Sequence, residues 1–241
     1  MAPTRDYRVN SNKLTVLSGG AAQGLVAALA SEFKAQCGCE IDGTFGAVGA
    51  MRDKLLSGTP ADLLILTRAL IDELAAQGHV VPGSISNIGT VLTAVAVRSG
   101  EPSPDVGNAA GLRAALLAAD AIYFPDPKLA TAGIHFAKVI ERLGIAADVA
   151  SRIRTYPNGA TAMRELVAAT EKRPIGCTQV TEILNTPGAQ LVAPLPEGFE
   201  LATVYTAGVC TQAASPQQAR ELAALLTGDA ARAARERAGF V

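Results

Sequence analysis

The fold is decided by the stretch Leu14-Thr-Val-Leu-Ser-Gly-Gly-Ala21, a short aliphatic run that ends in small residues. Leu25, Leu29 and Phe33 then follow at helical spacing, and Gly38 marks the end of that helix. A strand that passes through glycines directly into a helix is the repeating unit of a parallel α/β sheet. This stretch therefore predicts an α/β fold.

The same unit recurs along the chain. The expected strands cover residues 14–17, 40–45, 62–66, 88–98, 121–124, 154–156, 175–179 and 201–210. The expected helices cover residues 21–36, 48–56, 70–76, 112–119, 132–143, 161–170 and 215–238. Short strands that alternate with longer helical segments are typical of α/β domains.

Two of the expected strands are longer than the rest and bracket the second round of the pattern. They cover residues 88–98 and 201–210, and two such crossovers predict a hinge between two lobes. The first lobe is expected to be discontinuous, with residues 1–86 and 200–241, and the second to hold residues 87–199. The interpretation is two open α/β domains joined by two crossover strands, with a ligand cleft between them.

Composition and charge exclude several classes of protein. The chain of 241 residues is 49% hydrophobic and carries 21 Lys and Arg against 22 Asp and Glu, so it lacks the basic excess of a nucleic-acid binder. No apolar stretch approaches the roughly 20 residues that span a bilayer, which predicts no membrane insertion. Residues 1–13 lack the apolar core of a secretory signal. The protein is expected to be periplasmic if a leader was removed from this chain, and cytoplasmic otherwise.

The sequence contains no motif that indicates a metal site or a cofactor site. Cys37 and Cys39 lack the second ligand pair of a zinc site, and residues 18–24 lack the spacing of a dinucleotide-binding loop. We therefore expect no metal and no cofactor. The four cysteines are expected to be free thiols, with a bridge between Cys177 and Cys210 left open for an oxidising compartment.

The junctions between strands and helices share one unusual property, which is that they are small, uncharged and rich in glycine. They are residues 18–21, 46–49, 129–133 and 158–161, and none contains a carboxylate. A helix N-terminus without acidic side chains offers its main-chain N–H groups to an anion. Such junctions meet at one edge of an open sheet, so they predict an anion site, although tight turning alone would also require the glycines.

Several of these segments together resemble a known family. They are Leu14-Thr-Val-Leu-Ser-Gly-Gly-Ala21, Phe45-Gly-Ala-Val-Gly49, Pro60-Ala-Asp-Leu-Leu-Ile-Leu66, Thr131-Ala-Gly133 and Pro174-Ile-Gly176. In this order they resemble the periplasmic molybdate-binding proteins of ABC importers. That resemblance implies a two-lobed type II solute-binding fold that closes on a tetrahedral oxyanion, with an ABC transporter permease as partner if the chain is exported.

The departures from the family bear on the ligand. Ala21 replaces the serine that faces molybdate in that family, residues 46–49 replace a serine-rich junction, and Gln179 corresponds to its tyrosine. The Ser-Gly-Gly-Ala version also resembles a divergent branch that includes aconitate isomerase and handles organic carboxylates. The resemblance therefore leaves two ligand classes open, an oxyanion or an organic carboxylate.

The expected ligand-binding residues fall into three groups. The main-chain N–H groups of Gly19, Gly20, Ala21, Ala47, Val48, Ala132 and Thr161 are expected to carry the negative charge of the ligand. Hydroxyl groups of Ser18 and Thr131, the guanidinium of Arg68 and the neutral groups of Gln179 and Tyr205 are expected to set selectivity. We expect Arg68, after the third strand, to point into the cleft and hold a carboxylate.

Two function classes remain from the sequence. The first is a solute-binding protein that captures a small anion between its lobes by helix N-termini. The alternative is an isomerase that acts on an unsaturated polycarboxylate on the same fold, in which case His135 is the expected base. A cytoplasmic sensor is disfavoured, because no DNA-binding segment is attached to the chain.

Overall fold

The computed structural model describes residues 13–241, so the prediction about a leader falls outside the described residues. The strands are β1 (Lys13–Gly19), β2 (Glu40–Gly46), β3 (Leu63–Thr67), β4 (Ser86–Arg98), β5 (Ala121–Pro125), β6 (Ile153–Tyr156), β7 (Pro174–Gln179), β8 (Ala189–Pro194) and β9 (Ala202–Val209). The helices are α1 (Gln23–Cys37), α2 (Val48–Leu56), α3 (Arg68–Ala76), α4 (Ala109–Ala118), α5 (Thr131–Arg142), α6 (Ala146–Val149), α7 (Gly159–Ala168), α8 (Val180–Leu184), α9 (Pro216–Thr227) and α10 (Arg232–Ala238).

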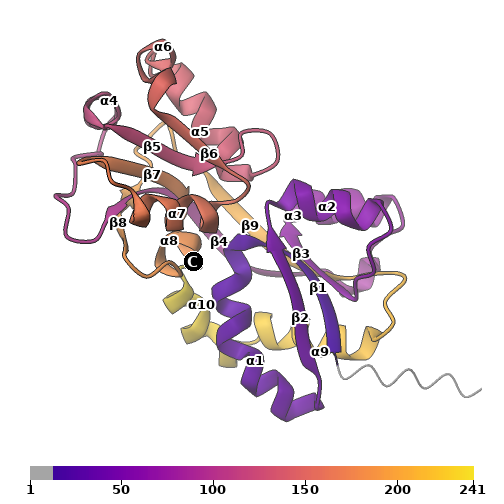
Figure 1. Ribbon diagram of the computed structural model, residues 1–241. Coiled ribbons are helices and arrows are strands. Elements are labelled where there is room, and N and C mark those ends of the chain that lie inside the picture. Colours follow the sequence, from indigo (N-terminus) through magenta and orange to yellow (C-terminus); the bar gives the residue numbers. More distant parts are fainter. Residues whose placement is uncertain (1–12) are drawn as a thin grey trace, which may run out of the picture.

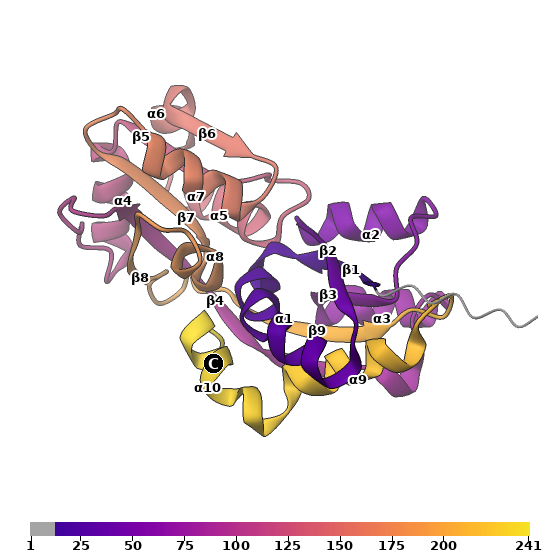
Figure 2. The same ribbon diagram turned by 60° about the horizontal axis from the view of Figure 1, so that its bottom comes forward.

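The elements form two lobes (Figures 1 and 2). In the one that we call lobe I, β2, β1 and β3 run parallel and β9 joins them antiparallel. In lobe II, β6, β5 and β7 run parallel. The full strand order is β2-β1-β3-β9-β4-β7-β5-β6, with β8 beside β4. This arrangement confirms the predicted α/β fold with two open sheets.

The long strand β4 links the lobes. Its first part, residues 86–92, pairs antiparallel with β9 of lobe I, and its second part, residues 93–98, pairs with β7 and β8 of lobe II. The chain passes from β8 of lobe II into β9, which pairs with β3 and with the first part of β4. Both predicted crossover strands are therefore present, while the proposed lobe boundaries at residues 86 and 200 stay a prediction.

Each lobe has apolar side chains packed against its sheet. In lobe I, β3 is buried along Leu63–Leu66, as its continuous apolar run predicts for a strand covered on both faces. In lobe II, Phe124 on β5 and Phe136 on α5 pack edge to face with ring centres 5.3 Å apart. These cores hold the carboxyl ends of the parallel strands in fixed positions.

The structure differs from the sequence-based prediction in two places. The helix expected over 215–238 is interrupted, because Gly228 adopts an extended conformation and the Arg235 guanidinium donates to the carbonyl oxygens of Leu226 and Gly228. The second difference is that α6, α8 and β8 were not predicted at all. α8 follows β7 directly and lies where the two lobes meet (Figure 1).

Candidate functional site

The cleft between the lobes narrows to a small cavity, which we call the inner pocket. Its volume is about 20 Å³. It is lined by Gly20, Gly46, Ala47, Val48, Pro125, Ala130, Thr131, Ala132, Asn158, Gly159, Gln179, Glu182 and Tyr205. Most of these residues end a parallel strand or follow one, which is the edge where open α/β sheets bind their ligands.

A wider cavity of about 380 Å³, the outer vestibule, adjoins the inner pocket and shares Val48 and Thr131 with it. It is lined by Val48, Gly49, Arg52, Thr67, Leu70, Lys128, Leu129, Thr131, Ile134, His135, Lys138 and Leu201. No carboxylate occurs among these described residues, and three of them are cationic. Arg52 is paired with Asp53 at 2.8 Å, so Lys128 and Lys138 supply most of the positive charge that the vestibule offers to a ligand.

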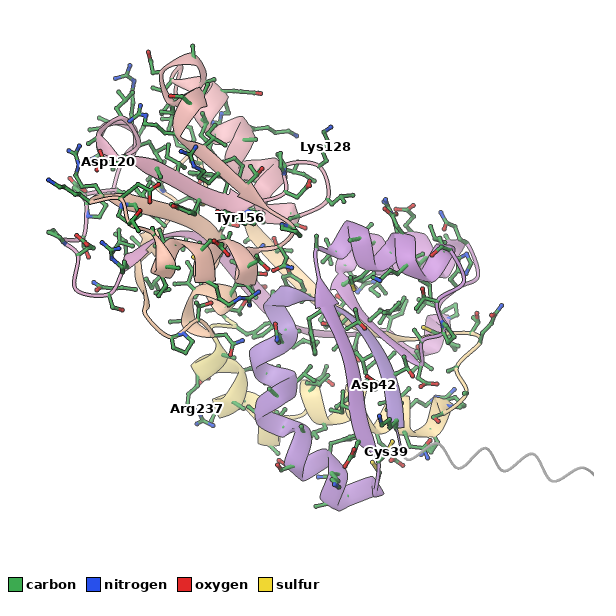
Figure 3. All side chains as sticks on the ribbon, viewed as in Figure 1. Cys39, Asp42, Asp120, Lys128, Tyr156 and Arg237 are labelled. Atoms are coloured by element: carbon green, nitrogen blue, oxygen red, sulfur yellow. The ribbon has the colours of Figure 1, made fainter. Side chains whose placement is uncertain are left out.

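One backbone contact joins the lobes beside the vestibule. The N–H of Gly49 in the first turn of α2 donates to the carbonyl oxygen of Leu129, before α5, at 3.1 Å. A Cβ on Gly49 would lie only 2.9 Å from that oxygen, so the approach requires glycine. Figure 3 shows Lys128 on the loop of lobe II that lies nearest α2. The two lobes therefore touch across the mouth of the cleft.

The N-termini of α2 and α5 meet at this place from opposite lobes. Neither helix has an acidic residue in its first turn, as the sequence predicts. Ala47 and Val48 at α2, and Thr131 and Ala132 at α5, line the inner pocket. The positive ends of two helices therefore face the same space, where they favour a negative charge.

A carboxyl group that the sequence analysis did not anticipate lies in the inner pocket. Glu182 on α8 is 6% exposed, and its Oε2 accepts a hydrogen bond from the Thr178 hydroxyl at 2.5 Å. Backbone N–H groups of Gly159, Ala160 and Gln179 also hydrogen-bond to this carboxyl group. The carboxyl group of Glu182 thus occupies the N-terminus of α7, where main-chain donors face it.

Two glycines make room for Glu182. A Cβ on Gly159 would collide with Oε2 of Glu182 and the hydroxyl of Thr178, and a Cβ on Gly20 would collide with Oε1 of Glu182. Gly20 belongs to the turn η1 (Gly20–Ala22) of lobe I, whereas Gly159 begins α7 of lobe II. The two carboxylate oxygens therefore face opposite lobes, with Oε1 toward lobe I.

Burial decides the ionisation behaviour of the inner pocket. It raises the pKa of Glu182 above its usual value, although the hydrogen bonds from Thr178 and from the backbone partly offset this effect. Burial also raises the pKa of Tyr205, so its phenol is neutral across the physiological range. No ion pair with Glu182 exists among residues 13–241, so hydrogen bonds alone balance its charge.

Gln179 adds a buried amide group to the wall of the inner pocket. Its side chain is 2% exposed, and its Nε2 donates to the Thr203 hydroxyl at 3.4 Å. Its Oε1 is buried and accepts no hydrogen bond from any described residue. Buried polar atoms without a partner are uncommon, which marks this oxygen as an acceptor available to a ligand.

The predicted site residues divide into those that line the cleft and those that do not. The structure brings Gly20, Ala47, Val48, Thr131, Ala132, Gln179 and Tyr205 together in the inner pocket. Gly19 and Ala21 flank Gly20 in the chain without lining that cavity. The Ser18 hydroxyl is buried and donates to the carbonyl of Gly19 at 2.9 Å, so it serves the backbone.

Arg68 and Thr161 are bound to other partners. Arg68 lies at the start of α3, half exposed, and its Nε donates to Asp72 one turn later at 2.8 Å. It does not line the cleft, because this carboxylate draws the guanidinium along the helix surface. The N–H of Thr161 donates to the N-capping side chain of Asn158 at 2.8 Å and is therefore engaged.

His135 lines the outer vestibule, apart from the inner pocket. Its Nε2 lies 2.7 Å from the carbonyl oxygen of Phe199. A carbonyl oxygen only accepts, so Nε2 carries the hydrogen and Nδ1 is the basic nitrogen of the ring. His135 thus faces the mouth of the cleft, where Lys138 lies on the same helix.

The part of the chain that the structure describes gives little support to a metal site, a disulfide or a membrane-spanning helix. Among residues 13–241, no group of three or more His, Cys, Asp or Glu side chains is placed to hold a metal ion. The four cysteines are free thiols. Within the same residues, each helix is too short or too polar to cross a membrane.

Comparison with known proteins agrees with this architecture. A family model described as bacterial extracellular solute-binding protein matches residues 14–241. A protein of Pseudomonas sp. named aconitate isomerase is 27% identical over 229 residues, which cover 91% of this chain and 84% of that protein.

Solved structures show the same fold. The periplasmic molybdate-binding protein of Azotobacter vinelandii superposes with a TM-score of 0.77 at 19% identity, covering 95% of this chain and 98% of that one. The sulfate-binding protein SubI of Mycobacterium tuberculosis H37Rv gives a TM-score of 0.74 at 17% identity, covering 95% and 86%. At these identities the likeness concerns the fold and leaves the ligand open.

Proposed function

Since the chain belongs to the family of bacterial extracellular solute-binding proteins, we propose that it captures a small anion between its two lobes. One observation carries the proposal, which is the meeting of the α2 and α5 N-termini from opposite lobes beside a vestibule lined by cations. Helix N-termini and lysine side chains stabilise the same charge, and the vestibule is large enough for an ion with several carboxylates. Both oxyanions and organic carboxylates are candidates.

Capture requires the lobes to open and close. β4 and β9 form the connection, and the contact between Gly49 and Leu129 closes the mouth. Hinge closure around a ligand is a common motion in two-domain proteins. The proposed cycle is that the cleft opens at β4 and β9, an anion enters the vestibule, and the Gly49 contact forms as the lobes close over it.

A thermal-shift titration tests the proposal. We expect at least one ion among molybdate, tungstate, sulfate, phosphate, citrate and the aconitates to raise the melting temperature, with a shift that grows with ligand concentration. Sodium chloride at matched ionic strength is the control. Failure of every ion in this panel to stabilise the protein would contradict the capture of a small anion.

A second candidate function is isomerisation of an unsaturated polycarboxylate. It is favoured by the buried carboxyl group of Glu182 in the cleft, because a carboxylate with a raised pKa is suited to take up a proton, and by the 27% identity to a protein named aconitate isomerase. Incubation with trans-aconitate, followed by chromatography of the cis isomer, separates the candidates. An inactive protein that still binds aconitate would exclude the isomerase.

We also propose where the protein acts and which partner receives its ligand. Membership of an extracellular solute-binding family supports a periplasmic or extracellular site of action and delivery of the ligand to an ABC transporter permease. Cell fractionation of the full gene product tests the location. Co-purification with a permease from membranes, in the presence of the stabilising anion and in its absence, tests the partner.

A further inference from the structure

We propose that Glu182 and Gln179 form a pair of hydrogen-bond acceptors, so that the cleft selects small anions that bring a hydrogen-bond donor into the inner pocket. This inference rests on the proposed capture of an anion and narrows its ligand class to anions such as hydroxycarboxylates. Anions that only accept hydrogen bonds are disfavoured.

The geometry of Glu182 provides the first support. Its Oε2 is fixed in lobe II by the Thr178 hydroxyl, while its Oε1 faces Gly20 of lobe I. A group that enters between the lobes therefore meets Oε1. The main-chain N–H groups of Gly159, Ala160 and Gln179 bond to the same carboxyl group and favour its ionised form, in which both oxygens are acceptors.

Gln179 provides an independent observation. Its side chain lines the same pocket, and its buried Oε1 lacks a hydrogen-bond donor among the described residues. The Thr203 hydroxyl accepts from its Nε2, which keeps the amide oriented with the oxygen free. Two acceptor oxygens on adjacent elements, β7 and α8, therefore offer a site for one donor.

The size of the pocket limits the donor to a small group. A volume of about 20 Å³ corresponds to about one water molecule, which is the size of a hydroxyl group. The remainder of the ligand would extend past the N-termini of α2 and α5 into the vestibule, where Lys128 and Lys138 face it. An anion with carboxylates at one end and a hydroxyl at the other matches this distribution of charge.

Glu182 is the group whose protonation is expected to control ligand preference in the inner pocket. Among the described residues that line the pocket, Tyr205 on β9 is the only other titratable side chain. The turn η1, the first turn of α7 and β7 contribute none. Arg52, Lys128, His135 and Lys138 line the vestibule, and Arg237 of α10 lines a different cavity beside Thr181 of α8.

Citrate and tricarballylate test the inference as a matched pair. Both carry three carboxylates on the same carbon chain, and only citrate has a hydroxyl group. Isothermal titration near neutral pH should show citrate binding about tenfold or more tightly, because a pocket built to hydrogen-bond a hydroxyl rejects the analogue that lacks it. Sulfate is included as a small anion that only accepts hydrogen bonds.

Glu182→Gln is the decisive variant. Its amide oxygen can still accept from Thr178 while its NH₂ group turns into the pocket, so an acceptor becomes a donor. The preference for citrate should fall to about threefold or less, and sulfate or tricarballylate should bind more tightly than to the wild type. Glu165→Gln, an exposed position on α7, is the control and should keep the wild-type preference.

A pH series on the unmodified protein provides a second measurement. Protonation of Glu182 gives it an O–H donor, so lowering the pH toward mildly acidic values should strengthen tricarballylate binding relative to citrate binding. The sign follows from the protonated form of Glu182, which is favoured as the pH falls. Loss of this dependence in Glu182→Gln assigns it to Glu182, since the protonation of the two ligands is the same with either protein.

Each outcome decides the inference. A citrate preference that disappears in Glu182→Gln supports it. Equal affinities in the wild type, a preference that persists in Glu182→Gln, or tight binding of sulfate or molybdate alone near neutral pH would overturn it while leaving anion capture intact. Absence of binding for all of these ions, in the wild type and in Glu182→Gln, would instead refute the proposed function, and the inference with it.

Discussion

The inner pocket and the outer vestibule are neighbouring parts of one cleft, yet their chemistry is opposite. The vestibule is lined by Arg52, Lys128, His135 and Lys138, with no carboxylate among its described lining residues. The inner pocket has no cationic side chain among the described residues of its lining, and it holds the buried carboxyl group of Glu182. A ligand that fills both parts is therefore expected to be anionic at its outer end and to bring a single hydrogen-bond donor to Glu182 at its inner end.

The two parts also differ in how they are held. Glu182 is fixed by the Thr178 hydroxyl and by main-chain N–H groups, so its position is part of the packed structure. Lys128 and Lys138 are exposed and surround the opening. Changes in the inner pocket should therefore affect stability as well as binding, whereas changes in the vestibule should affect binding alone.

The largest expected effect is that of Glu182→Ala on stability. The Thr178 hydroxyl and the N–H groups of Gly159 and Ala160 would lose a buried acceptor. Each unsatisfied donor costs about 1–3 kcal/mol, so the free energy of unfolding in urea should fall by about 2–4 kcal/mol after partial relaxation. Glu165→Ala on the exposed face of α7 is the control, with a change of about 0.5 kcal/mol or less.

Equal stabilities of Glu182→Ala and Glu165→Ala would contradict the expected structural role of Glu182 in the inner pocket. That result would mean that the donors at α7 and α8 find other acceptors. The inner pocket would then not be organised around a carboxyl group.

Gly159→Ala tests the packing around Glu182 at a glycine that lines the inner pocket. The added Cβ collides with Glu182 and with the Thr178 hydroxyl, both of which are buried. Overpacking of this kind costs about 1–3 kcal/mol of unfolding free energy. Gly83→Ala is the matched control, because a Cβ there meets no atom within 4 Å and its φ is not in the left-handed region. A stability loss at Gly83 equal to that at Gly159 would show that glycine content, and not the carboxyl group, is responsible.

The vestibule and its helix ends were more accessible to prediction than the inner pocket. The junctions at residues 46–49 and 129–133 are visible in the sequence as small residues between a strand and a helix, and α2 begins and ends at the expected residues. These features depend on neighbours in the chain. Local periodicity and turn chemistry are therefore sufficient to find them.

Glu182 was missed because its role depends on contacts between distant segments. It lies on α8, a helix of five residues that is too short to show an amphipathic period. One local signal was present, since Glu182 stands three residues after Gln179, the spacing of a capping box. That Glu182 also reaches Gly159 and Gly20 follows only from the packing of α7 and η1 around it.

Arg68 shows the converse error, in which a plausible residue was assigned to the cleft. Asp72 lies four residues later on the same helix, and this spacing favours an ion pair. The pair raises the pKa of the Arg68 guanidinium and holds it on the surface of α3. The i, i+4 spacing is visible in the sequence, and this ion pair outweighs the position of Arg68 at the end of a strand.

Gly49→Val tests the contact between the lobes, which lies at the boundary between the inner pocket and the outer vestibule. The new side chain would meet the backbone of Leu129 and hold the lobes apart, since Cβ alone lies 2.9 Å from its carbonyl oxygen. We expect citrate affinity, measured by isothermal titration, to fall about tenfold, which corresponds to about 1.4 kcal/mol. Small-angle scattering with saturating citrate should show a larger radius of gyration than the wild type.

The control for Gly49→Val is Leu56→Val at the exposed end of the same helix. It introduces the same side chain away from the lobe contact. A wild-type affinity in Gly49→Val would show that the contact with Leu129 does not contribute to the ligand-bound state.

The smallest expected effect is that of a single vestibule cation. Lys138 lies at the opening of the cleft and is exposed, so water and salt screen its attraction for an anion. Lys138→Ala should weaken citrate binding about two- to fivefold, in line with about 0.4–1 kcal/mol for an exposed charge pair. Its unfolding free energy should match that of the wild type. The salt dependence of the citrate affinity should also be less steep, because one charge no longer takes part.

Lys172→Ala is the matched control, because it removes an exposed cation just before the amino end of β7. Equal losses of affinity in both variants would mean that overall charge attracts the ligand, and the vestibule would then have no special part in recognition.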